Sequence, residues 1–183
     1  MISDNLFSLQ NKVIVVTGGT GVLGDSFVKS IVQAGGIPVV LGRNQEVAEA
    51  RALAIVNNGR EALAVVADVL DQDSLIHAKD VILKKYGRID GLVNAAGGNM
   101  PGAVVEPSAS VFDLDIDSLN KVMNLNLFGT ILPTQIFGKE IANTGSGSIV
   151  NISSMASQTA ITKVLGYSIA KSAIDGYTKW FAV

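Results

Sequence analysis

Residues 12–24 read Lys-Val-Ile-Val-Val-Thr-Gly-Gly-Thr-Gly-Val-Leu-Gly, and this stretch decides the fold. The β-branched run at 12–16 is typical of a central strand in a parallel sheet. Glycines at 19, 21 and 24 then spell G-x-G-x-x-G, and a helical pattern follows until Gly35-Gly36. In such a unit the backbone can approach a pyrophosphate, and the helix N-terminus offers free N–H groups. The alternative is an ordinary glycine-rich turn, but the flanking strand and helix favour nucleotide binding.

The same alternation of strand and helix continues along the chain. We expect further strands at 37–41, 62–66, 89–93 and 148–152, and further helices at 45–58, 72–86, 117–143 and 166–183. This order predicts an α/β fold, a doubly wound parallel sheet with helices on both faces. With 183 residues and 48% apolar composition, the chain is expected to form one domain over 1–183.

Composition excludes several classes of function. The net charge of −2, without a basic block, argues against nucleic acid or an anionic membrane as partner. Because the chain has no cysteine, disulfides, thiolate metal sites and cysteine nucleophiles are excluded. His77 is the only histidine, so no metal site is expected. No apolar run has the length of a membrane span, and residues 1–5 lack the features of a signal peptide, so we expect a cytoplasmic protein.

The end of the second strand bears on the choice of dinucleotide. An NAD site usually has an acidic residue about 20 positions after the glycines, but this chain has Gly42-Arg43-Asn44 there. An arginine can hold a 2′-phosphate through two charge-assisted hydrogen bonds, which favours NADP. Alternatively, Arg43 is a solvated loop cation and NAD is used. Asp68, after the third strand, is a candidate acceptor for an adenine amino group, or else a turn residue or helix cap.

Small residues follow the fourth strand, in the sequence Asn94-Ala95-Ala96-Gly97-Gly98. They would let a flat ring or a ribose approach the edge at which ligands bind in open α/β folds. The loop at 98–116 contains Pro101, Gly102 and Pro107 and is expected to form part of a substrate site.

Residues 117–143 have the pattern of one long helix, with Asp115 or Asp117 as its N-cap. Pro133 lacks a backbone donor and is expected to kink this helix. Asn126 lies among apolar neighbours near the break, and a buried amide needs hydrogen-bonding partners. We expect locally freed backbone groups and a trapped water to supply them.

The final segment contains Ser154, Tyr167 and Lys171. The spacing of Tyr167 and Lys171 places both on one face of a helix, one turn apart. An ammonium beside a phenol favours the phenolate, and such a phenol can exchange a proton with an alcohol or carbonyl oxygen. Ser154, which follows the fifth strand, could hydrogen-bond the same oxygen. A Tyr-x-x-x-Lys pair alone is a weak signal, because most such pairs lie on helix surfaces.

In this order the motifs resemble the classical short-chain dehydrogenase/reductase family over essentially the whole chain. The matching pieces are Thr17-Gly18 with Gly24, Asp68-Val69, Asn94-Ala95-Ala96-Gly97, Asn126, Ser154 and Tyr167-x-x-x-Lys171. The resemblance implies a Rossmann-type domain and an NAD(P)-dependent oxidoreductase that interconverts a secondary alcohol and a ketone. The cofactor residues that it implies are Gly18, Thr20, Gly21, Val22, Leu23, Gly24, Arg43, Asp68, Val69, Asn94, Ala95, Ala96, Gly97, Tyr167 and Lys171.

The resemblance also assigns catalytic roles to four residues. Tyr167 would be the acid/base, and Lys171 would activate it and hold the nicotinamide ribose. Ser154 would orient the substrate carbonyl. Asn126 would hold a water that links Lys171 to solvent as a proton relay.

Two departures from the family pattern are visible. Val22 stands where the family usually has glycine, two positions before Gly24, so the loop is expected to follow a slightly different path. Family members also continue past the Tyr167 helix with further strands and a substrate-covering segment, whereas this chain stops at Val183. We therefore expect a truncated chain.

A narrower resemblance concerns the substrate. The stretches 96–101, 132–135 and 162–164 are similar to the D-mannonate oxidoreductase (fructuronate reductase) branch. The resemblance implies a sugar acid as substrate, with Ser154, Asn99 and Lys163 as candidate contacts and Lys163 facing the carboxylate. An exposed loop lysine is the alternative. Other polyol or 3-oxoacyl substrates, or a non-catalytic nucleotide-binding sensor or scaffold, stay open as functions.

The family resemblance further implies a homo-dimer or homo-tetramer. Family members usually pair through two long helices, which correspond to 117–143 and the segment from 166 onward. Apolar residues on the second of these helices are Ala170, Ala173, Ile174, Tyr177 and Phe181.

Overall fold

A computed structural model describes residues 7–106 and 109–183. The N-terminal residues 1–5, considered above for a signal peptide, and Pro107 of the predicted substrate loop lie outside the described residues. Within the described ranges, no helix is long and apolar enough to cross a membrane.

A five-stranded parallel sheet has the order β3-β2-β1-β4-β5. Its strands are β1 (Val13–Thr17), β2 (Ile37–Gly42), β3 (Leu63–Val66), β4 (Gly91–Asn94) and β5 (Ser148–Asn151). The strand order reverses at β1, where Thr17 pairs with Leu41 of β2 on one side and Asn94 of β4 on the other. This register aligns the carboxyl ends of the central strands and creates a crevice where ligands bind in such sheets.

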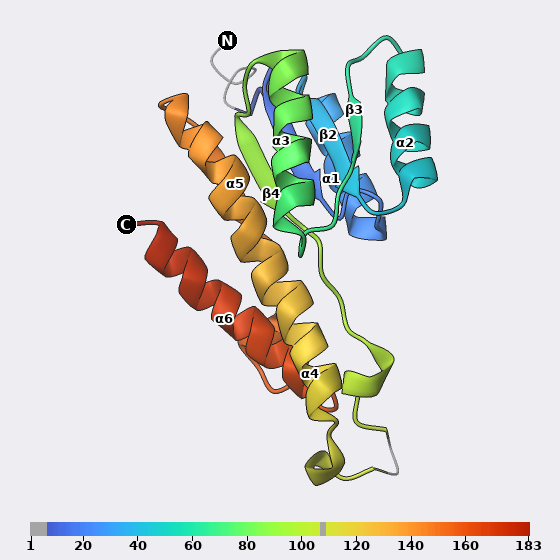
Figure 1. Ribbon diagram of the computed structural model, residues 1–183, viewed down its shortest axis with the longest axis vertical. Coiled ribbons are helices and arrows are strands. Elements are labelled where there is room, and N and C mark those ends of the chain that lie inside the picture. The colour runs from blue at the N-terminus through green and yellow to red at the C-terminus, as the bar shows by residue number, and fades with distance from the viewer. Residues whose placement is uncertain (1–6, 107–108) are drawn as a thin grey trace.

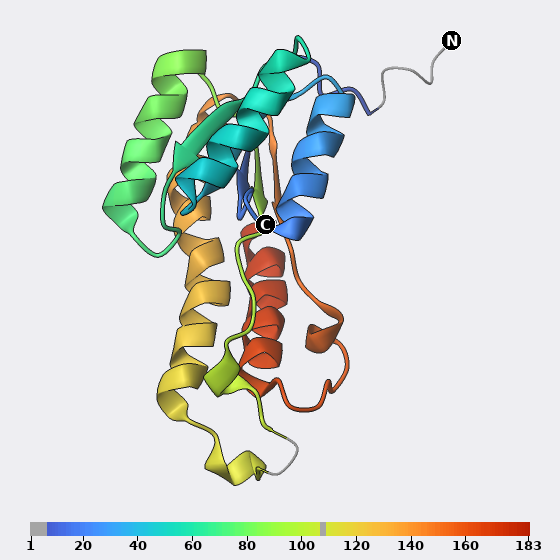
Figure 2. The ribbon, with the colours of Figure 1, turned by 90° about the vertical axis from the view of Figure 1, so that its right-hand side faces the viewer.

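Helices cover both faces of the sheet, as predicted (Figures 1 and 2). The helices of the chain are α1 (Val22–Gln33), α2 (Gln45–Asn57), α3 (Gln72–Tyr86), α4 (Ile116–Met123), α5 (Gly129–Asn143) and α6 (Leu165–Phe181). Of these, α1 and α2 pack on one face of the sheet, and α3 and α5 on the other. Short 3₁₀ turns are η1 (Pro101–Ala103), η2 (Val111–Asp113) and η4 (Met155–Ser157).

The alternating side chains of the strands divide the core in two. Val13, Val15 and Val39 face α3 and α5, where they join Leu75 and Phe137 in one buried cluster. Residues Ile14, Val16 and Val40 face α1 and α2 and join Val28, Ile31 and Ala48 in the second cluster. Burial on both faces explains why the β1 sequence is continuously apolar rather than alternating.

Residues 117–143 were predicted to form one long helix with a kink at Pro133, but the α-helix is interrupted earlier, at 124–128, and Pro133 lies inside α5. A π-helical segment, η3 (Asn124–Phe128), separates α4 from α5. The Asn126 side-chain amide donates to the carbonyl of Val122, which would accept the Asn126 N–H in a regular α-helix. This competition accounts for the wider turn, and such π-segments are frequent at functional sites. Asp115, rather than Asp117, is the N-cap of α4.

Two long helical columns extend beyond the sheet at the edge from which β4 continues (Figures 1 and 2). One column is α4, η3 and α5, and the other is α6, which packs against α4 and η3. The last helix was predicted to reach Val183, whereas α6 ends at Phe181, where Ala182 is its C-cap. The columns place Asn126 and α6 beside the carboxyl ends of β4 and β5.

Candidate functional site

The glycine-rich turn after β1 passes close to the end of β4. Gly18 has a φ of +65°, and a Cβ there would lie 2.8 Å from the carbonyl oxygen of Ala95. Glycine is therefore required both for the conformation and for the approach. Gly21 is the N-cap of α1, and the exposed Val22 and Leu23 begin that helix. Their N–H groups belong to the first turn, which lacks acceptors within the helix.

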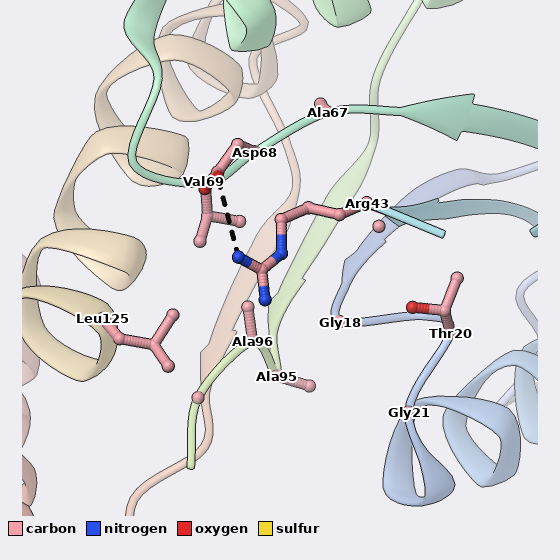
Figure 3. A pocket seen from close by; sticks show the side chains of 12 residues that line it. Gly18, Thr20, Gly21, Arg43, Ala67, Asp68, Val69, Ala95, Ala96 and Leu125 are labelled. Atoms are coloured by element: carbon pink, nitrogen blue, oxygen red, sulfur yellow. Dashed lines mark ion pairs between the residues drawn. The ribbon is translucent and has the colours of Figure 1, made fainter. Parts of the chain in front are cut away.

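A cavity of about 280 Å³ opens beside this turn, at the carboxyl ends of β1 to β4 (Figure 3). Of the predicted cofactor residues, it brings together Gly18, Thr20, Gly21, Arg43, Asp68, Val69, Ala95, Ala96 and Gly97. Gly42, Ala67 and Leu125 also line it. Gly42 and Ala67 are next to predicted cofactor residues in the sequence. Leu125 had no sequence feature that indicated a place in the cavity, because only the fold brings η3 to this edge of the sheet.

Asn94 does not line the cavity but lies buried behind it. Its side-chain amide donates to the Thr134 hydroxyl and to the Asn151 side chain, both at 2.8 Å. Thr17 acts from the other strand, because its hydroxyl accepts from the N–H groups of Ala95 and Ala96 at 3.1 and 3.2 Å. These side chains hold the turn after β4 in place against β1 and α5.

Arg43 extends across the cavity toward Asp68 (Figure 3). Its guanidinium lies 3.8 Å from the carboxylate, and its side chain is 74% exposed. Asp68 also accepts from the N–H of Leu70, which makes it a turn residue, whereas Asp71 caps α3. The structure therefore places Arg43 at the cavity rather than in bulk solvent alone.

Tyr167 and Lys171 lie one turn apart on α6. The Lys171 ammonium is 5.6 Å from the centre of the Tyr167 ring and donates to the carbonyl of Ile152 at 2.6 Å. Lys171 is only 5% exposed. Burial lowers the pKa of its ammonium, and the negative charge of Asp175, one turn further along, opposes this effect. A buried amine next to a phenol is therefore held at the end of β5.

Asn126 joins this cluster from the opposite column. It is fully buried, and its side chain accepts from the N–H of Gly98 at 3.1 Å and donates to the Gly98 carbonyl at 2.7 Å. A Cβ on Gly97 would lie 2.7 Å from the Asn126 side-chain oxygen and 3.5 Å from the Lys171 ammonium. Gly97 thus joins the cavity to the Lys171 cluster. The partners of the Asn126 side chain are backbone groups, and the freed Val122 carbonyl is among them as expected.

Ser154 immediately precedes the turn η4, and its hydroxyl accepts from the N–H of Ala156 at 3.1 Å. Around it lies a network that the sequence did not reveal. Gln158 donates to the carboxylate of Asp175 at 2.9 Å, and hydrogen bonds from Ser153 and Ser157 lower the pKa of the Asp175 carboxyl. The network fastens the turn that carries Ser154 to the helix that carries Lys171.

The predicted substrate contacts are more dispersed. Lys163 is exposed, has a φ of +73° and lines a second cavity of about 540 Å³. That cavity includes Ser157 and Ser168 but neither Ser154 nor Tyr167 in its lining. Asn99 is exposed on the loop after β4. The structure therefore brings Tyr167, Lys171 and Asn126 together and leaves Lys163 in a neighbouring hollow.

The remaining polar candidates do not form a further site. His77 is exposed on α3. Among residues 7–106 and 109–183, no group of three or more His, Cys, Asp or Glu side chains is arranged to hold a metal ion.

Comparison with known proteins bears on the identity of this arrangement. The family model described as short chain dehydrogenase matches residues 12–183. An uncharacterized oxidoreductase of Bacillus subtilis, UxuB, is 39% identical over 184 residues, which cover 96% of this chain and 66% of that protein.

Solved structures share the fold. One, from Haemophilus influenza, is provisionally described as a D-mannonate oxidoreductase with bound NAD. It is 35% identical, with a TM-score of 0.89, and the match covers 96% of this chain and 66% of that one. A xylitol dehydrogenase bound to NAD+ is 28% identical, with a TM-score of 0.87, over 95% of this chain and 65% of the other. The chain thus spans just under two thirds of the length of these relatives.

Proposed function

The chain belongs to the short-chain dehydrogenase family, and we propose that it is an NAD(P)-dependent oxidoreductase that interconverts a secondary alcohol and a ketone. One observation carries the proposal. Gly97 lines the cavity beside the glycine-rich turn and is also the residue against which Asn126 and Lys171 pack. A nucleotide cradle and a buried amine–phenol pair therefore share one edge of the sheet.

The residues present fit a dinucleotide. Gly18 lets two chain segments meet without side chains between them, which leaves the backbone free to approach a flat or phosphorylated ligand. The N-terminus of α1 supplies unpaired N–H groups and a positive dipole end for a pyrophosphate. Gly18, Thr20, Gly21, Val69, Ala95 and Ala96 would hold the adenosine and phosphate half. The bound nicotinamide supplies or accepts the hydride.

We propose that Arg43 decides the preference between the two dinucleotides. It reaches the cavity, and its partner Asp68 is 3.8 Å away, so a 2′-phosphate would offer the guanidinium a closer, bidentate acceptor. NADP is then the preferred cofactor and NAD is also accepted. Steady-state kinetics with NADPH and NADH test this: Arg43→Ala should lower kcat/KM for NADPH selectively, and an unchanged ratio would contradict it.

Proton transfer is the work of the chain itself. We propose that the Tyr167 hydroxyl gives a proton to the substrate oxygen during reduction and takes it back during oxidation. The Lys171 ammonium stabilises negative charge on the phenol. Ser154 hydrogen-bonds the same substrate oxygen. Asn126 keeps η3 open beside Lys171, and water there relays protons between that amine and solvent.

For the substrate we propose a sugar acid of the D-mannonate and D-fructuronate type. The support is the similarity to the provisional D-mannonate oxidoreductase and to UxuB, together with the sequence motifs at 96–101 and 162–164. Lys163, in the hollow next to the Ser154 turn, is the proposed partner of the carboxylate, with Asn99 nearby in the β4 loop. Unchanged KM for fructuronate in Lys163→Met would remove Lys163 from the site.

The proposed oligomer is a dimer or tetramer formed through the helical columns. Of the apolar residues expected to offer surface on α6, Ala170 and Ile174 are buried within the chain, whereas Phe181 is exposed. Further exposed apolar residues on these columns are Ile169, Trp180 and Phe128. Light scattering of the purified protein measures the assembly directly, and a monomer at micromolar concentration would contradict this part of the proposal.

Replacing Tyr167 with phenylalanine tests the function as a whole. Oxidation of NADPH and NADH is followed with a panel of keto-acids, ketoses and 3-oxoacyl substrates. Tyr167→Phe should lose turnover while NADH binding persists, because it removes only the hydroxyl. Tyr86→Phe is the matched control, since the Tyr86 hydroxyl is buried without a partner in the described part of the chain. Equal turnover by Tyr167→Phe and the parent would refute the proposal, and cofactor binding without turnover of any substrate would indicate a sensor.

A further inference from the structure

Arg51 of α2 contacts the glycine-rich turn and lines a different hollow from the cavity beside that turn. Its side chain is 23% exposed. One guanidinium nitrogen, Nη1, donates both to the carbonyl of Gly19 and to the carbonyl of Gly21, the latter at 2.8 Å. An arginine of α2, and not of the helix that follows the turn, therefore hydrogen-bonds two carbonyl groups of the turn.

The planar peptide unit links the direction of each held carbonyl to the direction of the N–H group that follows it. In a trans peptide the C=O of one residue and the N–H of the next point in opposite directions. With the Gly19 and Gly21 carbonyls held toward Arg51, the N–H groups of Thr20 and Val22 must point away from it. Thr20 and Gly21 line the cavity beside the turn, whereas Arg51 does not.

Both of these N–H groups are free of acceptors in the described part of the chain. The N–H of Gly19 donates to the Leu41 carbonyl at 2.9 Å, and that of Gly21 donates to the Gly18 carbonyl at 2.8 Å. Within residues 7–106 and 109–183, neither Thr20 nor Val22 donates its N–H to any acceptor. Unpaired donors that face a cavity need a ligand or water.

Charge around Arg51 also matters for an anionic ligand. Asp25, in the first turn of α1, would repel a phosphate bound at the start of that helix. The Arg51 Nε lies 3.4 Å from its carboxylate, and the Lys29 ammonium lies 2.6 Å from it. Two cations thus offset one anion, but only Arg51 also contacts the turn.

We infer that Arg51 is a positioning residue that aims the Thr20 and Val22 N–H groups at the pyrophosphate of the dinucleotide. The inference rests on the proposed function, because it takes the ligand to be a dinucleotide. A positioning role and a purely structural role of Arg51 predict different effects on ligands with and without phosphate groups. If Arg51 only tethered α2 to the turn, its loss would weaken phosphorylated and unphosphorylated ligands alike.

The test therefore compares the affinities of a phosphorylated and an unphosphorylated ligand. ADP and adenosine are measured in competition with NADH, whose fluorescence reports binding, for the parent, Arg51→Met and Lys29→Met. Arg51→Met should weaken ADP about tenfold, which is ~1.4 kcal/mol, and leave adenosine within about twofold. Lys29→Met removes the same charge without a contact to the turn, so both ligands should stay within about twofold of the parent.

Three results would overturn the inference: an equal loss for ADP and adenosine in Arg51→Met, an equal ADP loss in Lys29→Met, or no ADP loss at all. If Arg51→Met does not fold, the ratio of ADP to adenosine affinity is measured on Arg51→Gln, whose amide keeps one neutral donor. That ratio should fall between those of the parent and a full loss, and an unchanged ratio would refute the role. A parent that binds no NADH would instead refute the proposed function.

Discussion

Replacing Lys171 with methionine removes the charge beside the Tyr167 ring while keeping a long apolar side chain. Lys171 is 5% exposed, so the substitution puts no new group into solvent. The methionine also leaves the Ile152 carbonyl without its donor. We therefore expect two separable effects, one on catalysis and one on stability.

The catalytic effect follows from the distance between the groups. At an effective dielectric constant of ~20, two unit charges separated by the 5.6 Å between the Lys171 ammonium and the Tyr167 ring attract by about 3 kcal/mol. Loss of that attraction lowers the rate of a step that places negative charge on the phenol by roughly 100-fold. The unpaired Ile152 carbonyl lowers the free energy of unfolding by about 1–3 kcal/mol.

The assay is kcat for ketone reduction, at saturating cofactor and substrate, followed by absorbance of NADPH. Lys179→Met is the matched control, since Lys179 lies on the same helix, is exposed and carries the same charge. Its kcat should stay within about twofold of the parent, because an exposed charge is well screened. Chemical denaturation of both variants measures the stability effect separately.

The pH dependence gives an independent check. Because burial lowers the pKa of Lys171, its positive charge is lost at a lower pH than that of an ordinary lysine. Activity of the parent should therefore decline on the alkaline side as this amine deprotonates, and Lys171→Met should lack that decline. A kcat for Lys171→Met equal to that of Lys179→Met would refute the electrostatic role.

Three further predictions concern stability and binding. Burial alone would raise the pKa of the Asp90 carboxyl, but hydrogen bonds from Arg88 and a backbone N–H outweigh it and hold the pKa below its usual value. The contribution of Asp90 to stability is thus complete above its unfolded-state pKa and is lost as pH falls through the folded-state value. Asp90→Asn should cost about 2 kcal/mol at neutral pH and flatten the acid side of the profile, as urea unfolding across pH would measure. In Gly24→Ala the new Cβ would collide with the Gly18 carbonyl oxygen, so NADH titration should detect a large loss of affinity, whereas unchanged affinity would show that the turn can move. Asn126→Asp replaces an amide that donates to two carbonyls by an acceptor, so the melting temperature should fall, and an unchanged value would contradict the importance of these bonds.

Local sequence patterns were sufficient for the sheet and most of its helices. Val13 to Thr17, for example, form a strand because a continuous β-branched run suits a position buried on both faces. The left-handed cap at Gly87 ends α3 where predicted, since glycine adopts that conformation without strain. Patterns of this kind act within a few residues, so they can be recognised without knowledge of the fold.

The candidate site was predictable from the sequence where both residues of a contact lie on the same helix. Tyr167 and Lys171 share a helix face, and their proximity follows from helical spacing alone. The π-helical segment was not predictable, because it depends on the Asn126 side chain competing for a carbonyl inside its own helix. The other hydrogen-bonding partner of the Asn126 side chain is Gly98, which lies 28 residues away on the loop after β4.

The sequence by itself thus determined three features: a parallel α/β sheet, a glycine-rich turn suited to a nucleotide, and a lysine one helical turn from a tyrosine. Only the tertiary structure decided which side chains from different elements meet, such as Arg51 behind the glycine turn and Leu125 across the cavity. The physical reason is range. Backbone preferences and helical spacing act over one or two turns, whereas these contacts depend on where packed helices place atoms from distant parts of the chain.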